Sequence, residues 1–234
     1  MRLADITLVL PTRDEVHNIA GFLDSIPDEL NLIVVDASRD ATPDLIEARR
    51  PHRTTVLREP GTVTEARQRG ASVASTEWLL FSDADVVFAP GYFDRLAALS
   101  GSGVFYGPKL SRDRYRYYYR GIARGQAICQ ALGIPAASGS NLLVPRAALM
   151  DVGGFDLCLN CNEDSEVVWR LHRAGHRARY LPDLPVFASD HRRLERGRLS
   201  KTLHSFARCV LLYTDLMPRK YRSHDWGYWQ NRHG

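Results

Sequence analysis

The sequence predicts an α/β domain with a mostly parallel central sheet and helices on both of its faces. Short apolar runs alternate with segments of helical periodicity through the first half of the chain, which is the pattern of βαβ units. Polar residues cluster directly after three of the apolar runs, as expected where parallel strands end at one edge of a sheet. The 234 residues, 44% of them hydrophobic, can build one sizeable core.

The first half of the chain supplies the most regular elements. Each predicted strand is a short apolar run that ends at a polar residue or a proline, as a buried strand should. The runs predicted as strands are Ile6 to Leu10, Leu32 to Val35, Thr55 to Leu57 and Trp78 to Phe81. The segments predicted as helices between them are Ile19 to Ile26, Pro43 to Ala48 and Gly61 to Ala74.

The second half is less regular, and shorter signals predict its elements. Tyr115 to Leu132 has helical character, and Asp164 to Ala174 is an amphipathic helix that ends at Gly175. Leu199 to Met217 is a further helix, followed by Pro218. Short strand signals lie within residues 136–144, 177–181 and 185–189.

Charge and cysteine content argue against several classes of protein. The net charge is +4, but acidic residues are interspersed among the arginines, so nucleic acid is not an expected partner. Cys158 and Cys161 form a C-x-x-C without a second pair, which argues against structural zinc and favours free thiols in a reducing cytosol over a redox pair. We find neither a signal peptide nor a membrane-spanning run. The expected location is cytoplasmic, with the inner face of the membrane as an alternative.

Asp83-Ala84-Asp85 directly follows the apolar run that ends at Phe81. Two carboxylates at the end of a buried strand are costly without a cationic partner. A divalent cation, Mn²⁺ or Mg²⁺, held by one or two carboxylates and substrate phosphates satisfies this requirement. The alternative is a strand-end turn with solvated acids, and the position after a buried strand favours the metal.

Three further groups of residues have both a functional and a structural interpretation. Asn162-Glu163-Asp164 precedes a helix and supplies either an ordinary helix cap or a general base. Asp36, Ser38 and Asp40 follow the second strand and either contact a nucleotide or form an Asx turn. Of Arg67 and Arg69, one faces a diphosphate or a base, while at least one is expected on a solvated helix face.

Taken in order, these segments resemble glycosyltransferase family 2. The resemblance extends from about residue 6 to residue 191. The segments similar to the family's motifs are P-T-R-D-E at 11–15, V-V-D-A-S-R-D-A-T at 34–42, A-R-Q-R-G at 66–70, F-S-D-A-D at 81–85, G-S-N at 139–141, G-G-F-D at 153–156 and E-D at 163–164.

The resemblance implies a GT-A fold and an inverting transfer of a sugar from a nucleotide-diphosphate donor, most commonly a UDP-sugar, to an acceptor hydroxyl. Asp164 and Glu163 are implied as the catalytic residues, with Asp164 as the general base. Asp83 and Asp85 are implied as metal ligands, with His191 as a further ligand. The residues implied in donor binding are Pro11, Thr12, Arg13, Glu15, Asp36, Ser38, Arg67, Asp83 and Ala84.

The C-terminal stretch extends beyond the resemblance. We therefore divide the chain into a catalytic domain, residues 1–190, and a basic, partly helical extension, residues 191–234. The extension carries arginines before and after an apolar helical segment. It either lies on an anionic membrane surface, binds the phosphate of a lipid-linked acceptor, or packs on the catalytic domain with a solvated basic rim. A small-molecule acceptor and a homodimer are also among the expected partners.

Other functions fit the sequence less well. A nucleotidyltransferase would be expected to carry a glycine-rich phosphate loop after the first strand, and residues 11–15 contain no glycine. The same absence argues against a dinucleotide oxidoreductase. A nucleotide-binding, non-catalytic partner subunit is the remaining alternative, although a scaffold has no need of carboxylates at several converging strand ends.

Overall fold

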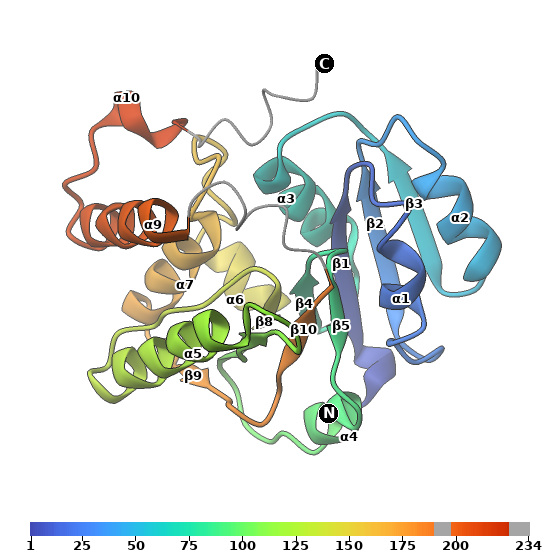
Figure 1. The fold of residues 1–234 in the computed structure, drawn as a ribbon, viewed down its shortest axis with the longest axis horizontal. Helices are drawn as coiled ribbons and strands as arrows, with labels where there is room; N and C mark the ends of the chain where they lie inside the picture. Colours follow the sequence, from blue (N-terminus) through green and yellow to red (C-terminus); the bar gives the residue numbers. More distant parts are fainter. Residues whose placement is uncertain (190–197, 225–234) are drawn as a thin grey trace.

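The computed structural model describes residues 1–189 and 198–224 of the chain (Figure 1). Its centre is a seven-stranded sheet that is parallel over its first four strands. These strands are β1 (Ile6–Thr12), β2 (Asn31–Asp36), β3 (Thr54–Arg58) and β4 (Trp78–Ser82). They lie in the order β3-β2-β1-β4, which confirms the predicted α/β class and all four strands predicted in this half.

The helices between these strands also match the predictions, with shifted ends. A short 3₁₀ helix, η1 (Leu3–Asp5), precedes β1. The α-helices are α1 (Ile19–Leu23), α2 (Thr42–Arg49) and α3 (Val63–Val73). In α3, Thr62 and Glu65 form a reciprocal capping box that fixes the helix start. β1 continues two residues beyond its expected end at Leu10, through Pro11. β1 pairs with β4 only as far as Val9, and beyond that residue it pairs with β2 alone. Pro11, which has no N–H to donate, therefore lies where the strand has a neighbour on one side only.

The remaining strands of the large sheet come from the second half of the chain. β8 (Asn141–Pro145) pairs antiparallel with β4, and β6 (Val104–Tyr106) and β9 (Ala178–Tyr180) complete the order β4-β8-β6-β9. A second sheet has the order β5-β10-β7, formed by β5 (Val86–Phe88), β10 (Val186–Ala188) and β7 (Lys109–Leu110). This small sheet holds together the chain segments that follow β4, β6 and β9.

Two hydrophobic clusters cover the two faces of the large sheet. Leu8 and Leu10 of β1 pack on one face with Phe22 of α1. Val9, which points to the opposite face, packs with Phe81 and the helices on that side. This alternation along one fully buried strand is the expected arrangement for a sheet with helices on both faces.

Further helices complete the described part of the fold. They are α4 (Tyr92–Ala97), α5 (Arg116–Ala131), α6 (Arg146–Asp151), α7 (Glu163–Arg173), α9 (Arg198–Tyr213) and α10 (Arg219–Arg222). Figure 1 shows α1 and α2 at one end of the molecule and α5, α7 and α9 at the other. Among the described residues, every helix is too short or too polar to cross a bilayer. The proposed division between residues 190 and 191 falls at the start of a stretch that the structure does not describe, and it remains a prediction.

Candidate active site

The parallel order of β2, β1 and β4 brings the carboxyl ends of three strands to one edge of the sheet. Thr12 at the end of β1 is in register with Asp36 at the end of β2. β4 lies on the other side of β1 and is followed directly by Asp83. The three polar loops of the first half therefore share this edge of the sheet, where ligands bind in open α/β sheets.

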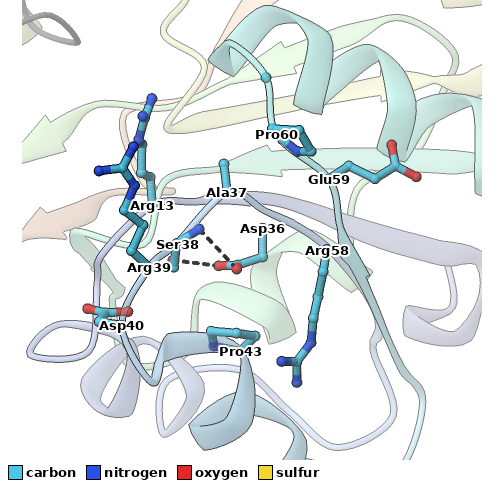
Figure 2. Close-up of a pocket in the computed structure, with 11 residues that line it drawn as sticks. Arg13, Asp36, Ala37, Ser38, Arg39, Asp40, Pro43, Arg58, Glu59 and Pro60 are labelled. Carbon is cyan, nitrogen blue, oxygen red and sulfur yellow. Dashed lines mark hydrogen bonds between the residues drawn. The ribbon is translucent and has the colours of Figure 1, made fainter.

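A cavity of about 500 Å³ opens beside the end of β2. Asp36 is buried at its base, where Oδ1 accepts hydrogen bonds from Thr12 Oγ1 (2.6 Å) and Ser38 Oγ (2.7 Å). The Ser38 N–H donates to Asp36 Oδ2 at 3.1 Å. Figure 2 shows this Asp36–Ser38 contact and the side chains around it. The residues lining the cavity are Arg13, Asp36, Ala37, Ser38, Arg39, Asp40, Pro43, Arg58, Glu59, Pro60 and Gly61.

The cavity is rich in guanidinium groups. Arg13 and Arg39 lie near each other on one side of it, and Arg58 lies across from them (Figure 2). Arg58 also pairs with Asp44 and Glu47 of α2. Guanidinium groups donate planar hydrogen bonds to phosphates and stack on aromatic bases, so the cavity suits a nucleotide.

Not every residue predicted to bind the donor lines this cavity. Arg13, Asp36 and Ser38 do. Ala84 is instead buried in the hydrophobic core, and the Glu15 carboxylate accepts a hydrogen bond from Asn18 Nδ2 at 2.6 Å beside the start of α1. Pro11 lies within β1 and is absent from the lining.

Arg67 connects two acidic segments that are distant in sequence. It lies on the inner face of α3 with 4% of its surface exposed. Its Nη2 atom donates to Asp83 Oδ1 at 2.8 Å, and its Nη1 atom donates to Glu163 Oε1. Arg69, by contrast, is exposed and pairs with Glu59, so the solvated alternative is correct for Arg69 and wrong for Arg67.

Gly139 leaves room for the Arg67 guanidinium. A Cβ atom on Gly139 would lie 2.4 Å from Cζ of Arg67, far inside the contact distance. The Gly139 N–H donates to Asp164 Oδ2 at 2.6 Å. The G-S-N segment therefore contacts both Arg67 and the E-D pair, which gathers Asp83, Arg67, Glu163 and Asp164 into one cluster.

Glu163 is buried within this cluster. Its burial raises the pKa of the carboxyl to about 7, and the negative charges of Asp164 and Asp83 act in the same direction. Arg67 opposes the shift by favouring the charged form. Glu163 therefore gains or loses its proton near neutral pH, directly beside Asp164.

The loop before α7 is held by the C-terminal part of the described chain. Asn162 has a left-handed backbone with φ of 61° and makes no side-chain helix cap, so the cap interpretation is wrong for Asn162. Its Nδ2 atom instead donates to Ser205 Oγ (2.8 Å) and Cys209 Sγ (3.4 Å) of α9. Asp164 follows in the first turn of α7, where Oδ1 accepts the N–H of Ser165 at 2.7 Å. Both oxygens of the Asp164 side chain thus accept a backbone N–H, which fixes the orientation of this carboxyl group.

Asp85 is paired with a lysine that the sequence analysis did not single out. Lys109 Nζ donates to Asp85 Oδ1 at 2.9 Å, and the Asp83 and Asp85 side chains are 18% and 13% exposed. No cluster of three His, Cys, Asp or Glu residues capable of holding a metal occurs within residues 1–189 and 198–224. His191 lies outside those ranges.

The donor set nevertheless fits a divalent ion. Asp83 and Asp85 supply hard carboxylate oxygens, and Mg²⁺ or Mn²⁺ usually takes one or two protein carboxylates and completes its shell with water and substrate phosphates. Lys109 is the competing cation at Asp85, so an ion bound there shares or displaces the lysine contact.

Comparison with known proteins agrees with the fold and the motifs. A family model described as glycosyl transferase family 2 matches residues 7–153. The pre-mycofactocin glycosyltransferase of Mycobacterium tuberculosis (strain CDC 1551 / Oshkosh) is 30% identical over 211 residues, covering 80% of this chain and 43% of that protein. The poly-beta-1,6-N-acetyl-D-glucosamine synthase of Staphylococcus aureus (strain COL) is 26% identical over 203 residues, covering 77% of this chain and 48% of the synthase. The chain thus spans less than half the length of these relatives.

Solved structures show the same fold at lower identity. The mannosyltransferase PcManGT from Pyrobaculum calidifontis, in complex with GDP-Man and Mn²⁺, superposes with a TM-score of 0.67 at 21% identity, covering 94% of this chain and 72% of that one. S. aureus TarS 1–349, in complex with UDP-GlcNAc, gives a TM-score of 0.69 at 18% identity, covering 92% and 72%. The predicted GT-A fold is confirmed.

Proposed function

Because the chain belongs to glycosyl transferase family 2, we propose that it transfers a sugar from a nucleotide-diphosphate donor to an acceptor hydroxyl, with inversion at the sugar carbon. The observation that carries the proposal is the position of Arg67. Its guanidinium binds Asp83 of the D-A-D segment and Glu163 of the E-D segment at once. The D-A-D segment and the E-D segment are thereby held on either side of a single buried side chain, with Asp85 and Asp164 next to the two acids that it binds.

The donor binds at the carboxyl edge of the parallel strands. Its nucleotide occupies the cavity at Asp36, Ser38 and Arg13, and its diphosphate extends toward Asp83 and Asp85. The donor is a UDP-sugar in this proposal, supported by the UDP-GlcNAc bound to TarS. Asp83 and Asp85 would hold a divalent ion, which would supply positive charge for the leaving diphosphate.

The acceptor approaches from the side of α7. Asp164 accepts the proton of the acceptor hydroxyl as that oxygen attacks the anomeric carbon, and the bond to the nucleotide diphosphate breaks on the opposite face. One displacement of this kind inverts the configuration. Glu163 and Asn162 do not react; they hold Asp164 in place, through Arg67 and through α9 respectively.

Calorimetry tests donor binding directly. UDP, GDP and dTDP are titrated into the protein with and without Mn²⁺. We expect UDP to bind most tightly and Mn²⁺ to strengthen its binding. An absence of binding for all three nucleotides would contradict the proposed donor site.

Product analysis tests the reaction. Incubation with a panel of UDP-, GDP- and dTDP-sugars and acceptors of different classes is followed by mass spectrometry, and NMR gives the anomeric configuration of the product. We expect a mass increase of one glycosyl unit and an inverted anomer. Nucleotide binding without turnover over the whole panel would favour a non-catalytic partner subunit, and a retained anomer would contradict the single displacement.

A further inference from the structure

The helix α5 is unusually exposed for its length. It runs over 16 residues, and of these only Gln126 is buried. Ile128 is 61% exposed and Leu132 is 69% exposed. A helix of this length with large apolar side chains in solvent is typical of an interaction surface.

The exposed side of α5 carries two stripes that follow one another along the helix. Arg116, Arg120 and Arg124 follow one another at intervals of four residues and are all exposed, so they form one row along the helix. Ile128 and Leu132, the latter just past the end of α5, continue this row at the same interval, Tyr117 lies beside it, and all three are exposed. The helix therefore presents a basic stripe in its first half that continues into an apolar stripe at its end.

The helix α9 runs in the same direction as α5 and is joined to this region by single hydrogen bonds near its two ends. Tyr118 near the start of α5 shares a hydrogen bond of 3.0 Å with Thr202 of α9, and the Tyr213 hydroxyl of α9 donates to the Pro135 carbonyl, just beyond α5, at 2.9 Å. Figure 1 shows the two helices with the same chain direction at one end of the molecule. Thr202 and Tyr118 thus mark the sides on which the helices face each other.

The exposed apolar residues of the two helices lie on the same side of this pair. At about 100° per residue, Phe206 and Val210 of α9 are rotated by about +40° and +80° from Thr202. Leu132 and Ile128 of α5 are rotated by about −40° and −80° from Tyr118. Two helices that run in the same direction face each other with opposite sides. Residues rotated by similar angles but in opposite senses from those facing sides therefore point to the same side of the pair. We call this surface, made of the two α5 stripes with Phe206 and Val210, the α5–α9 face.

We propose that the α5–α9 face docks on an anionic phospholipid membrane surface. Charge complementarity identifies this occupant, because neither α5 nor α9 contains an aspartate or a glutamate and the α5 arginines are exposed. Apolar side chains enter the boundary between headgroups and acyl chains, while the arginines reach the lipid phosphates. A nucleic acid would contact the arginines but leave the apolar stripe in water. A second copy of the same face would bring arginines against arginines.

Vesicle co-sedimentation tests the proposal with the whole chain. Vesicles of phosphatidylcholine alone are compared with vesicles that also contain phosphatidylglycerol in about equal amount. We expect the protein to partition onto the anionic vesicles at least tenfold more strongly, and high salt to weaken this binding. Equal partitioning onto both vesicles, or none onto either, would overturn the proposal whatever the variants do.

Variants locate the binding surface. We expect R116Q/R120Q/R124Q to weaken binding to anionic vesicles roughly a hundredfold, since each arginine near such a surface adds a comparable increment. I128S/L132S should weaken it about tenfold. The matched control R49Q/R53Q/R95Q removes the same charge from exposed positions outside α5 and α9 and should bind as the wild type does. Equal losses in the control and the α5 triple variant would contradict the assignment. A dimer that I128S/L132S dissociates would show that a second copy covers the face instead.

Discussion

The two halves of the molecule are built differently, although both contribute to one site. In the first half, residues 6–88, the parallel strands pair over four to six residues and bury nearly all of their apolar side chains. In the described part of the second half, residues 104–224, most strands have two or three residues and the long helix α5 is largely exposed. The comparison teaches that the well-buried parallel sheet carries the loops proposed to bind the donor, while the region with shorter strands carries the proposed base and the proposed docking face.

The two halves meet at Arg67. Arg67 and one of its acidic partners, Asp83, belong to the first half, and its other acidic partner, Glu163, belongs to the second half. If the halves divide the reaction as proposed, variants in the first half should impair donor binding and departure of the leaving group. Variants in the second half should impair transfer alone. The following predictions test that division, from the largest expected effect to the smallest.

The substitution D85A should have the largest effect. Loss of the carboxylate removes an ion ligand, so turnover should fall about a thousandfold or more and UDP affinity should fall with it. EDTA added to the wild type should reproduce the loss. The readout is product formation by mass spectrometry, with D24A at the exposed residue that follows α1 as a control. Full activity both in D85A and in EDTA would eliminate the metal role.

The substitution D164N should separate the two halves most clearly. A general base contributes about a hundredfold to ten-thousandfold, so kcat should fall by about a hundredfold to a thousandfold. The dissociation constant for UDP, measured by calorimetry, should stay unchanged. D151N, at an exposed position before the same loop, is the matched control. An equal fall in UDP affinity would show that Asp164 belongs to the donor site instead.

The substitution E163Q should change the pH dependence of stability. Burial raises the Glu163 pKa from 4.5 to about 7, so between these values the folded protein holds a proton that the unfolded chain has released. The free energy of unfolding should therefore fall as pH rises through this range, by up to roughly 3 kcal/mol. Urea denaturation across pH measures the slope. E163Q should flatten it, whereas E77Q on the surface should not, and identical slopes in all three proteins would refute the assignment.

The substitution G139A should damage the contact between the halves more modestly. The new methyl group overlaps the Arg67 guanidinium, so we expect a loss of about 1–3 kcal/mol in stability. G125A is the matched control, because nothing lies within 4 Å of its Cβ position in α5. It should stabilise the protein by about 0.5–1 kcal/mol. Thermal denaturation compares the two variants, and an unperturbed G139A would show that Arg67 moves away without cost.

The sequence predicted the first half well because its signals are strong. Strands buried on both faces are continuous apolar runs, and β1, β2 and β4 were therefore recognisable, as were the acids that follow them. Two strands of the small sheet were missed, because β5 and β7 have three and two residues, too few to show a period of two. The third strand, β10, lies within the strand signal predicted at residues 185–189. The fold was thus most predictable where burial is complete.

The sequence predicted the acidic residues of the site but not the residues that contact them. The spacing of Thr64, Arg67 and Ala71 along α3 places them on one helix face, and the structure shows all three buried. This spacing could have predicted that Arg67 is buried and that Arg69 is exposed. Lys109 and Ser205 gave no such signal, because their contacts with Asp85 and Asn162 join residues 24 and 43 positions apart. Only the tertiary fold brings these pairs together.

The shared guanidinium of Arg67 has a consequence for how the two substrates influence each other. An arginine does not give up its proton, so it is a fixed charge divided between two acids. Any cation that draws Asp83 away leaves more of that charge to Glu163, whose hold on its own proton then weakens. If a divalent ion arrives with the donor as proposed, the acceptor side would receive that arrival as a proton released from Glu163.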